Sequence, residues 1–146
     1  SSFLPSDVLA AILCAQMERY DEIMQKRLNV WNTYHAMLED CEKSGKLIRQ
    51  FVPDYAEHNG HMYNIILPSE EIRTKLIAEL KRHEVSAYIC YVPLHSAPKG
   101  MQLGWNPSDC PITEDYGKRV LRLPLYADMT AEQAGFVAKA VHDFLN

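Results

Sequence analysis

Long hydrophobic runs are missing from the sequence. Its longest apolar stretches, such as VLAAILCA, are far shorter than the roughly 20 residues that a membrane-spanning helix requires. The first residues carry no basic segment ahead of an apolar one, so no secretory signal peptide is visible. They begin instead with SSFLPSD, a loop followed by a helix start, which suggests a chain cut from a longer protein. We expect no membrane partner.

Clusters of basic residues are missing as well. Fifteen Lys and Arg residues stand against nineteen Asp and Glu residues, for a net charge of −4. No run rich in Lys and Arg is present that would neutralise a phosphate backbone. The sequence therefore predicts no nucleic-acid partner.

Spacings typical of metal ligands are the third absence. The four cysteines, Cys14, Cys41, Cys90 and Cys110, are widely separated and form no CxxC or Cys/His pattern. We expect no metal site and reduced thiols in a cytoplasmic protein, with disulfide bonds as the less favoured alternative.

A chain of 146 residues with 47% hydrophobic content predicts one domain, and its amino-terminal part predicts helix. Ser6 offers an N-cap, and residues 8–17 are almost wholly apolar, so we expect this first helix to be buried on most sides. From residue 20 to about 43, apolar residues recur at three- and four-residue spacing. This pattern predicts an amphipathic helix that ends near Gly45.

The rest of the chain mixes strands and helices. Residues 61–67 and 85–92 predict two strands, separated by a helix that Ser69 caps, and this order suggests an α/β unit. The segment 93–110 is rich in Pro and Gly and predicts a long irregular loop of a kind that is often functional. Three elements are expected after it: a short helix over 113–120, an extended LRLPLY segment, and a last helix over 130–145 with a capping box of Thr130 and Gln133.

Polar groups gather at the ends of the two predicted strands: His58, Asn59, His61, Tyr91 and His95. Ligand sites in α/β folds commonly lie at such strand ends. A structural role is favoured for His61, and a core position is as plausible as a ligand contact for Tyr91. Function is favoured for His95, because an imidazole in a Pro-rich loop has few packing reasons to be there and suits a phosphate or hydroxyl ligand.

Two further groups have both a chemical and a structural interpretation. Cys90 lies in a predicted strand without an obvious base beside it, which favours a buried inert thiol over a nucleophile. Arg119 and Arg122 could hold a carboxylate or a diphosphate by bidentate hydrogen bonds, whereas solvated surface charge is the simpler interpretation.

Four segments, taken in order and with their spacings, resemble one known family: SSFLPSDVLAAILCAQME, HNGHMYNIIL, YVPLHSAP and RVLRLPLY. They are similar to the carboxy-terminal third of the DegT-type nucleotide-sugar aminotransferases, which are fold-type I enzymes. The resemblance covers essentially the whole chain and implies an α/β fold of α+β-like form, with a long amino-terminal helix and a small β-sheet covered by helices. Residues 1–146 would form the small carboxy-terminal domain, with a linking helix at about 6–43.

The resemblance also implies a chemistry. In this family a larger domain, absent from this chain, binds pyridoxal phosphate through a Schiff-base lysine, and the cofactor serves as an electron sink. That lysine would lie before residue 1, and no lysine of this sequence stands in a matching context, so we expect the chain alone to be inactive. The complete enzyme would be a homodimer that moves an amino group from glutamate to C4 of a dTDP-linked 4-keto-6-deoxyhexose.

The same resemblance implies site residues. Ser2 stands where many members have an asparagine that reaches the cofactor phosphate. Tyr91 and His95 match a strand-end pattern that faces the mouth of the active site, and Cys90 replaces a histidine of that pattern. His61 matches a histidine with a binding or structural role. The alternative is a module that binds a nucleotide sugar or a partner protein without catalysis.

Overall fold

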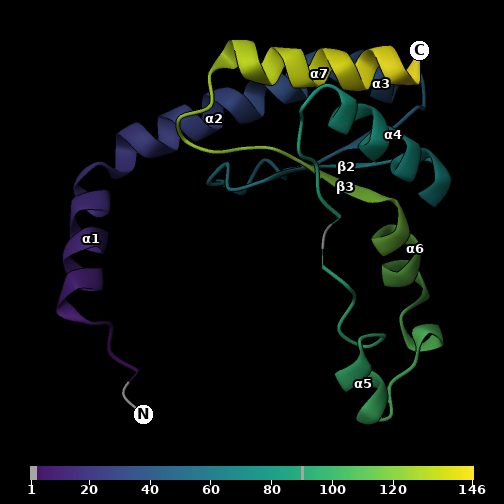
Figure 1. Ribbon diagram of the computed structural model, residues 1–146, viewed down its shortest axis with the longest axis horizontal. Coiled ribbons are helices and arrows are strands. Elements are labelled where there is room, and N and C mark those ends of the chain that lie inside the picture. The colour runs from purple at the N-terminus through teal and green to yellow at the C-terminus, as the bar shows by residue number, and fades with distance from the viewer. Residues whose placement is uncertain (1–2, 90) are drawn as a thin grey trace.

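A three-stranded antiparallel sheet lies at the centre of the structure, a computed structural model that describes residues 3–89 and 91–146. The strands β1 (Ile48–Arg49), β2 (Tyr63–Ile66) and β3 (Val120–Leu123) lie in this order, so β2 is in the middle. The register pairs the first residue of β2 with the last of β3. Segments that are far apart in the sequence therefore form one sheet (Figure 1).

One face of the sheet is covered by helices. Along β2 and β3 buried and half-buried residues alternate, as expected when only one face of a sheet packs against other elements. The helices α2 (Tyr20–Met37), α4 (Glu70–Arg82) and α7 (Ala131–Leu145) lie over this buried face (Figure 1). Most of the fully buried side chains come from these helices and from the two longer strands, and Leu38 directly follows α2; they include Tyr34, Leu38, Tyr63, Ile65, Leu76, Leu80, Leu121 and Val141.

The predicted caps form at the helix starts. The Ser69 hydroxyl accepts a hydrogen bond from the backbone N–H of Ile72 at 3.2 Å, which begins α4. Thr130 and Gln133 each accept a hydrogen bond from the other's backbone N–H, at 3.1 and 2.9 Å, and these bonds begin α7. Local sequence was sufficient at both positions because a cap needs only residues within one turn.

The amino-terminal helices are interrupted and only partly packed. The predicted helix over 20–43 breaks at Leu38, and the short α3 (Glu39–Lys43) follows before the turn at Gly45, whose φ is +71°. The first helix, α1 (Asp7–Glu18), is capped by Ser6 as expected but has no buried residue. The expectation that it is buried on most sides is wrong within this chain, because α1 extends away from the sheet and its covering helices (Figure 1).

A second region projects from the sheet, which we call the distal lobe (residues 93–119). It contains α5 (Pro98–Gln102), the 3₁₀ helix η1 (Pro107–Asp109) and α6 (Pro111–Arg119). The segment expected to be an irregular loop thus holds two short helices, each with a proline in its first turn, where the missing N–H costs nothing. The lobe lies on the side of the sheet away from α7 (Figure 1), and Arg73, near the amino end of α4, donates to the carbonyl of Gly117 in α6 at 3.1 Å.

The predicted strand over 85–92 does not form among the described residues. Only Tyr88 pairs with the sheet, through an isolated antiparallel bridge to Arg122. The ladder cannot continue past this bridge on one side, because Pro124 has no N–H to donate. The strand, helix, strand unit is therefore absent, and the fold is the α+β-like form of the predicted class: a small antiparallel sheet covered by helices.

Candidate functional site

The face of the sheet that carries no helices holds a pocket, which we call the outer groove. Its volume is about 740 Å³, within the range of about 300–1,000 Å³ that is usual for small-molecule sites. It lies where β3 ends and where the chain leaves Tyr88. The groove is lined by Met62, Ser86, Tyr88, Ile89, Tyr91, Arg122, Leu123, Pro124, Leu125 and Tyr126.

Of the described residues that line the outer groove, Arg122 is the only charged one. Its backbone N–H donates to the carbonyl of Tyr88 at 2.8 Å, and its carbonyl accepts from the Tyr88 N–H at 3.0 Å. Residues paired in this way across an antiparallel ladder place their side chains on the same face, so Arg122 and Tyr88 share the outer face. Among the described residues, no carboxylate forms an ion pair with Arg122.

Arg119, the other arginine singled out from the sequence, has a different role. Its Nε lies 3.1 Å from both carboxylate oxygens of Asp115, and its Nη1 donates to the carbonyl of Leu67 at 3.1 Å. Its guanidinium also lies 5.1 Å from the centroid of the Tyr116 ring. The hydrogen bond from Arg119 holds the pKa of Asp115 below its usual range. Arg119 therefore joins α6 to the end of β2 as a structural residue, and is neither a free ligand-binding group nor the solvated surface charge of the simpler interpretation.

His95 lies in the distal lobe and is paired with a carboxylate. Its Nε2 is 3.1 Å from Oε1 of Glu114 on α6, and both side chains are largely shielded from solvent. The backbone here is closely packed: a Cβ on Gly100 would lie 2.1 Å from the carbonyl oxygen of Leu94. His95 also lines a pocket of about 480 Å³ together with Trp105 and other residues of the lobe. The His95 Nε2 and Glu114 Oε1 atoms are close but do not meet the geometry of a hydrogen bond, so the contact places the imidazole beside a carboxylate in the lobe.

The three predicted substrate-binding residues are not brought together. His61 is exposed on the coil that precedes β2, with Nδ1 3.3 Å from Nη1 of Arg27. Tyr91 is 86% exposed and lines the outer groove and a smaller pocket beside α6. His95 lines neither of these two pockets. The predicted cofactor contact, Ser2, and the predicted inert thiol, Cys90, lie outside the described residues.

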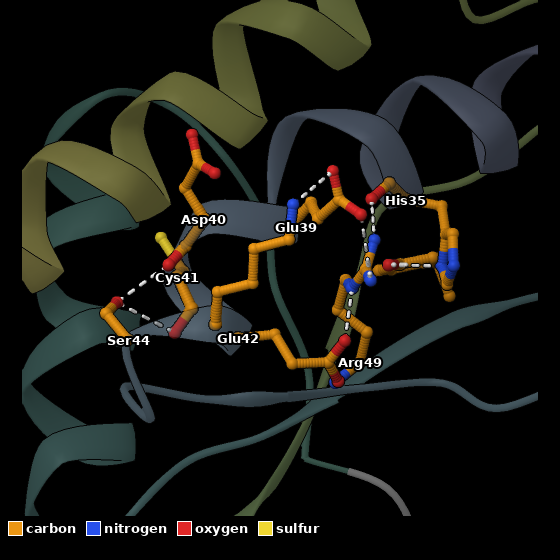
Figure 2. Close-up of polar contacts among 9 residues, drawn as sticks. His35, Glu39, Asp40, Cys41, Glu42, Ser44 and Arg49 are labelled. Carbon is orange, nitrogen blue, oxygen red and sulfur yellow. Dashed lines mark hydrogen bonds and ion pairs between the residues drawn. The ribbon is translucent and has the colours of Figure 1, made fainter.

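A polar cluster that the sequence did not indicate joins α2, α3 and β1 (Figure 2). The backbone N–H and the Nε of Arg49 donate to the two carboxylate oxygens of Glu42, each at 2.7 Å, and its Nη1 donates to the carbonyl of His35. Burial acts to raise the pKa of Glu42, but the hydrogen bonds from Arg49 outweigh it and hold this pKa below the usual range. The hydrogen bonds of Arg49 end within the fold, so the cluster fastens β1 to the break at Leu38.

His35 belongs to this cluster and to an aromatic group beside it. Its ring stacks on Trp31 at 4.6 Å between centroids, and its Nδ1 lies 3.3 Å from the hydroxyl of Tyr63. Burial, followed by the positive charge of Arg49, lowers the pKa of His35. The group is a packing element, because the His35 ring is stacked on Trp31, lies edge-on to Tyr63 and uses Nδ1 inside the chain.

The lysines of the chain do not provide a cofactor-binding amine. None is buried, and several are held in surface ion pairs, such as Lys26 with Glu22 at 2.7 Å and Lys43 with Glu39 at 3.0 Å. A lysine that forms a Schiff base at neutral pH needs a desolvated or cationic setting that favours its neutral amine, which a carboxylate partner opposes. The residues present therefore do not fit the role of anchoring pyridoxal phosphate.

Neither a metal site nor a membrane span is found in the part of the chain that the structure describes. No group of three or more His, Cys, Asp or Glu side chains there could hold a metal ion. No helix there combines the length and apolar character needed to cross a bilayer. Cys14, Cys41 and Cys110 are free thiols.

Comparison with known proteins relates the whole of this architecture to one group. Residues 5–142 match the DegT/DnrJ/EryC1/StrS aminotransferase family. The spore coat polysaccharide biosynthesis protein SpsC of Bacillus subtilis is 28% identical over 144 residues, which cover 95% of this chain and 36% of SpsC. The dTDP-3-amino-3,4,6-trideoxy-alpha-D-glucose transaminase of Micromonospora megalomicea is 27% identical over 141 residues, 95% of this chain and 37% of that enzyme.

Solved structures share the fold. The crystal structure of DesV from S. venezuelae, in complex with a ketimine intermediate, matches with a TM-score of 0.85 at 20% identity and covers 94% of this chain and 36% of DesV. A putative sugar aminotransferase of Streptococcus pneumoniae in its PLP form matches with a TM-score of 0.85 at 19% identity, over 95% of this chain and 35% of that protein. The chain thus spans little more than a third of the length of the proteins it resembles.

Proposed function

The chain belongs to the DegT/DnrJ/EryC1/StrS aminotransferase family, and from this premise we propose that it forms the small carboxy-terminal domain of a sugar aminotransferase that depends on pyridoxal phosphate. The observation that carries the proposal is the extent of the match, residues 5–142, which leaves almost no part of the chain for another module. The fold supports it, because the sheet has one face packed on helices and one face open with a pocket. Pyridoxal phosphate supplies the electron sink for amino transfer when it is bound in an enzyme of this kind.

In this proposal the chain contributes binding and positioning rather than the cofactor amine. Tyr91 presents its ring and hydroxyl at the outer groove, and His95, beside Glu114, presents an imidazole from the distal lobe. Of the three residues, His61 has the least support as a substrate-binding residue, because its Nδ1 contacts Arg27 at the surface. Ser2 would donate one hydrogen bond to the cofactor phosphate. Because its lysines carry no suitable amine, the chain alone would be inactive.

The finer assignment concerns the substrate. We propose glutamate as amino donor and C4 of a dTDP-linked 4-keto-6-deoxyhexose as acceptor, as in the dTDP-4-amino-4,6-dideoxygalactose transaminases that the four sequence segments resemble. The LRLPLY segment supplies Arg122 as a cation at the outer groove, which supports an anionic acceptor such as a nucleotide sugar.

The domain layout forms part of the same proposal. Residues 1–146 are the small domain, the helices over about 6–43 link it to a larger domain, and the complete enzyme is a cytoplasmic homodimer. The exposed apolar side chains of α1, such as Leu9 and Ile12, support a position against that domain or the second subunit, since an apolar surface of this kind is commonly an interface.

A grafting experiment tests the proposal. Residues 5–142 would replace the matching third of a characterised transaminase of the family, and formation of 2-oxoglutarate from glutamate would be followed with a dTDP-4-keto-6-deoxyhexose as acceptor. We expect activity that depends on both substrates and on pyridoxal phosphate. A folded chimera that binds the cofactor but transfers no amino group to any nucleotide-linked keto sugar would contradict the proposed function.

The chain by itself provides the complementary test. When it is mixed with pyridoxal phosphate and reduced with borohydride, we expect no stoichiometric adduct on any lysine by mass spectrometry. An adduct on one defined lysine would show that the chain carries its own cofactor amine and would refute the proposed division of roles.

A further inference from the structure

We propose that Arg122 and the tyrosines of the outer groove bind the diphosphate and the base of a nucleoside diphosphate. This inference rests on the proposed function, since it names the part of a nucleotide-sugar substrate that the small domain would hold. It goes further by assigning the binding to one guanidinium and one pocket. The argument depends on how Arg122 is placed, on the charges around it and on the aromatic lining.

Backbone hydrogen bonds fix the position of Arg122, and no described carboxylate forms an ion pair with its guanidinium. Two hydrogen bonds to Tyr88, at 2.8 and 3.0 Å, hold the main chain of Arg122 at the edge of the groove. Arg119, three residues earlier, is bonded to Asp115 and to the carbonyl of Leu67. Of the two arginines in RVLRLPLY, only Arg122 thus has a guanidinium available for a ligand among the described contacts. A guanidinium fork matches the paired oxygens of a phosphate group.

The charges around the outer groove favour an anion in the groove over one in the neighbouring pocket. No carboxylate lines the outer groove. A neighbouring pocket of about 600 Å³ shares Ser86, Pro124 and Tyr126 with it but is lined by Glu84 and Glu132. The two adjoining pockets therefore differ in the sign of the charged side chains that line them. The chain as a whole carries a net charge of −4. A diphosphate that reaches this rim is attracted to Arg122 and repelled from the other side.

The aromatic lining selects a nucleotide over a smaller anion. Tyr88, Tyr91 and Tyr126 all line the groove and are 65%, 86% and 49% exposed. Their rings offer flat surfaces on which a base can stack, and their hydroxyls can donate to phosphate oxygens. Glutamate has no ring to stack on the tyrosines, so their aromatic faces would add nothing to its binding. The aromatic lining therefore favours the nucleotide over glutamate, the amino donor, as the ligand of the outer groove.

The experiment measures binding of thymidine diphosphate to the 146-residue chain by titration calorimetry and by NMR of the tyrosine rings. We expect saturable binding that weakens with added salt, and Arg122→Gln to weaken it by about tenfold or more, as for loss of a charge-assisted hydrogen bond. Arg82→Gln is the matched control, because Arg82 is an exposed arginine on α4 that pairs with Glu79. This control should bind like the original chain.

Two further arms guard against a folding artefact and a different ligand. Arg122→Lys keeps the charge but loses the fork, so we expect affinity between those of Arg122→Gln and the original chain, with unchanged thermal melting. Tyr91→Ala, at an exposed side chain, removes a surface for base stacking and should weaken binding of thymidine diphosphate more than that of inorganic pyrophosphate. Glutamate should not displace thymidine diphosphate at concentrations where pyrophosphate does.

Three results would overturn the inference: no saturable binding of thymidine diphosphate by the folded chain, equal affinity for the original chain and Arg122→Gln, or displacement by glutamate as readily as by pyrophosphate. These failures are distinct from failure of the proposed function. An active chimera whose Michaelis constant for the nucleotide sugar is unchanged by Arg122→Gln would sustain the aminotransferase assignment and reject the role of Arg122.

Discussion

The helical core and the two projecting parts of the molecule differ in where their apolar side chains lie. In the core, Tyr34 and Leu76 are fully buried, whereas in α1 Leu9 is 60% exposed, and in the distal lobe Leu94 is 87% exposed. The core thus satisfies its hydrophobic residues within the chain, while α1 and the lobe present theirs outward. Apolar surface of this extent generally meets another surface. The difference indicates that the helical core is stabilised by contacts within the chain, whereas α1 and the distal lobe present apolar surface suited to contact with another domain or subunit.

Substitution of one buried and one exposed leucine tests this difference between the core and α1, and it has the largest expected effect on stability. Leu76→Ala leaves a cavity between α4 and the core, and we expect a loss of about 2–5 kcal/mol in the free energy of unfolding. Leu13→Ala removes an exposed side chain of α1, and its effect should stay within about 0.5 kcal/mol. Chemical denaturation followed by circular dichroism measures both. Equal losses would mean that α1 is packed in solution and would break the comparison.

A glycine pair tests the packing of the distal lobe. A Cβ on Gly100 would lie 2.1 and 2.7 Å from the carbonyl oxygens of Leu94 and His95, so Gly100→Ala must displace backbone, at a cost of about 1–3 kcal/mol. Gly135→Ala in α7 meets only Met37 at 3.6 Å, and we expect a gain of about 0.5–1 kcal/mol.

Hydrogen exchange locates where these two changes act. Gly100→Ala should accelerate exchange in residues 93–119 and leave α7 protected, because no side chain of the lobe belongs to the cluster of buried core residues. Loss of protection throughout the chain would show instead that the lobe and the core unfold as one unit.

Removal of the N-cap side chains of α7 and α1 is expected to have a smaller effect on stability. Thr130→Ala removes half of the capping box of α7, whose residues Val137 and Val141 are in the core, and should cost about 1 kcal/mol of global stability. Ser6→Ala removes the equivalent bond to Leu9 in α1 and should leave global stability unchanged while lowering helix content. Thermal melting and far-ultraviolet circular dichroism distinguish the two outcomes. A lower melting temperature for Ser6→Ala would contradict the idea that α1 is energetically separate.

The smallest expected effect is a pH dependence within the core. Since the pKa of His35 is lowered in the folded chain, the unfolded chain takes up a proton first as the pH falls below about 6.5. The free energy of unfolding should therefore be constant above that pH and decrease below it, although Glu39 and Glu42 oppose the shift and His58 reinforces it. Denaturation midpoints between about pH 7.5 and 5.5 measure this slope.

His35→Gln should flatten the slope, because the titrating group is gone. A slope that is identical in the original chain and in His35→Gln would place the pH dependence elsewhere.

Much of the fold could be predicted from the sequence where the signal is local. Ser6, Ser69 and Thr130 cap the helices that they were predicted to cap, and the strand over 61–67 appears as β2 in shortened form. The predicted strand over 85–92 was wrong because a strand needs a partner, and among the described residues of this segment only Tyr88 finds one. Alternation of apolar residues says that a segment can be extended, not that another strand lies beside it.

The candidate site was predictable in part. Tyr91 and Arg122 were singled out from the sequence, and the structure places both in one groove, although 31 positions separate them. The sequence could not distinguish Arg122 from Arg119, because the difference lies in Asp115 and the carbonyl of Leu67, which fold against only one of them. The cluster around Arg49 had no sequence signal at all, since its acceptors lie on two other elements.

By itself the sequence determined the family resemblance, the helix starts and the chemical groups that were available. These depend on residue identity and on neighbours within a turn or a strand, which a linear pattern records. Only the tertiary structure decided which arginine keeps its charge for a ligand, which apolar helix remains uncovered and which face of the sheet stays open. Those outcomes depend on hydrogen bonds and burial between residues far apart in the chain, and no local spacing encodes them.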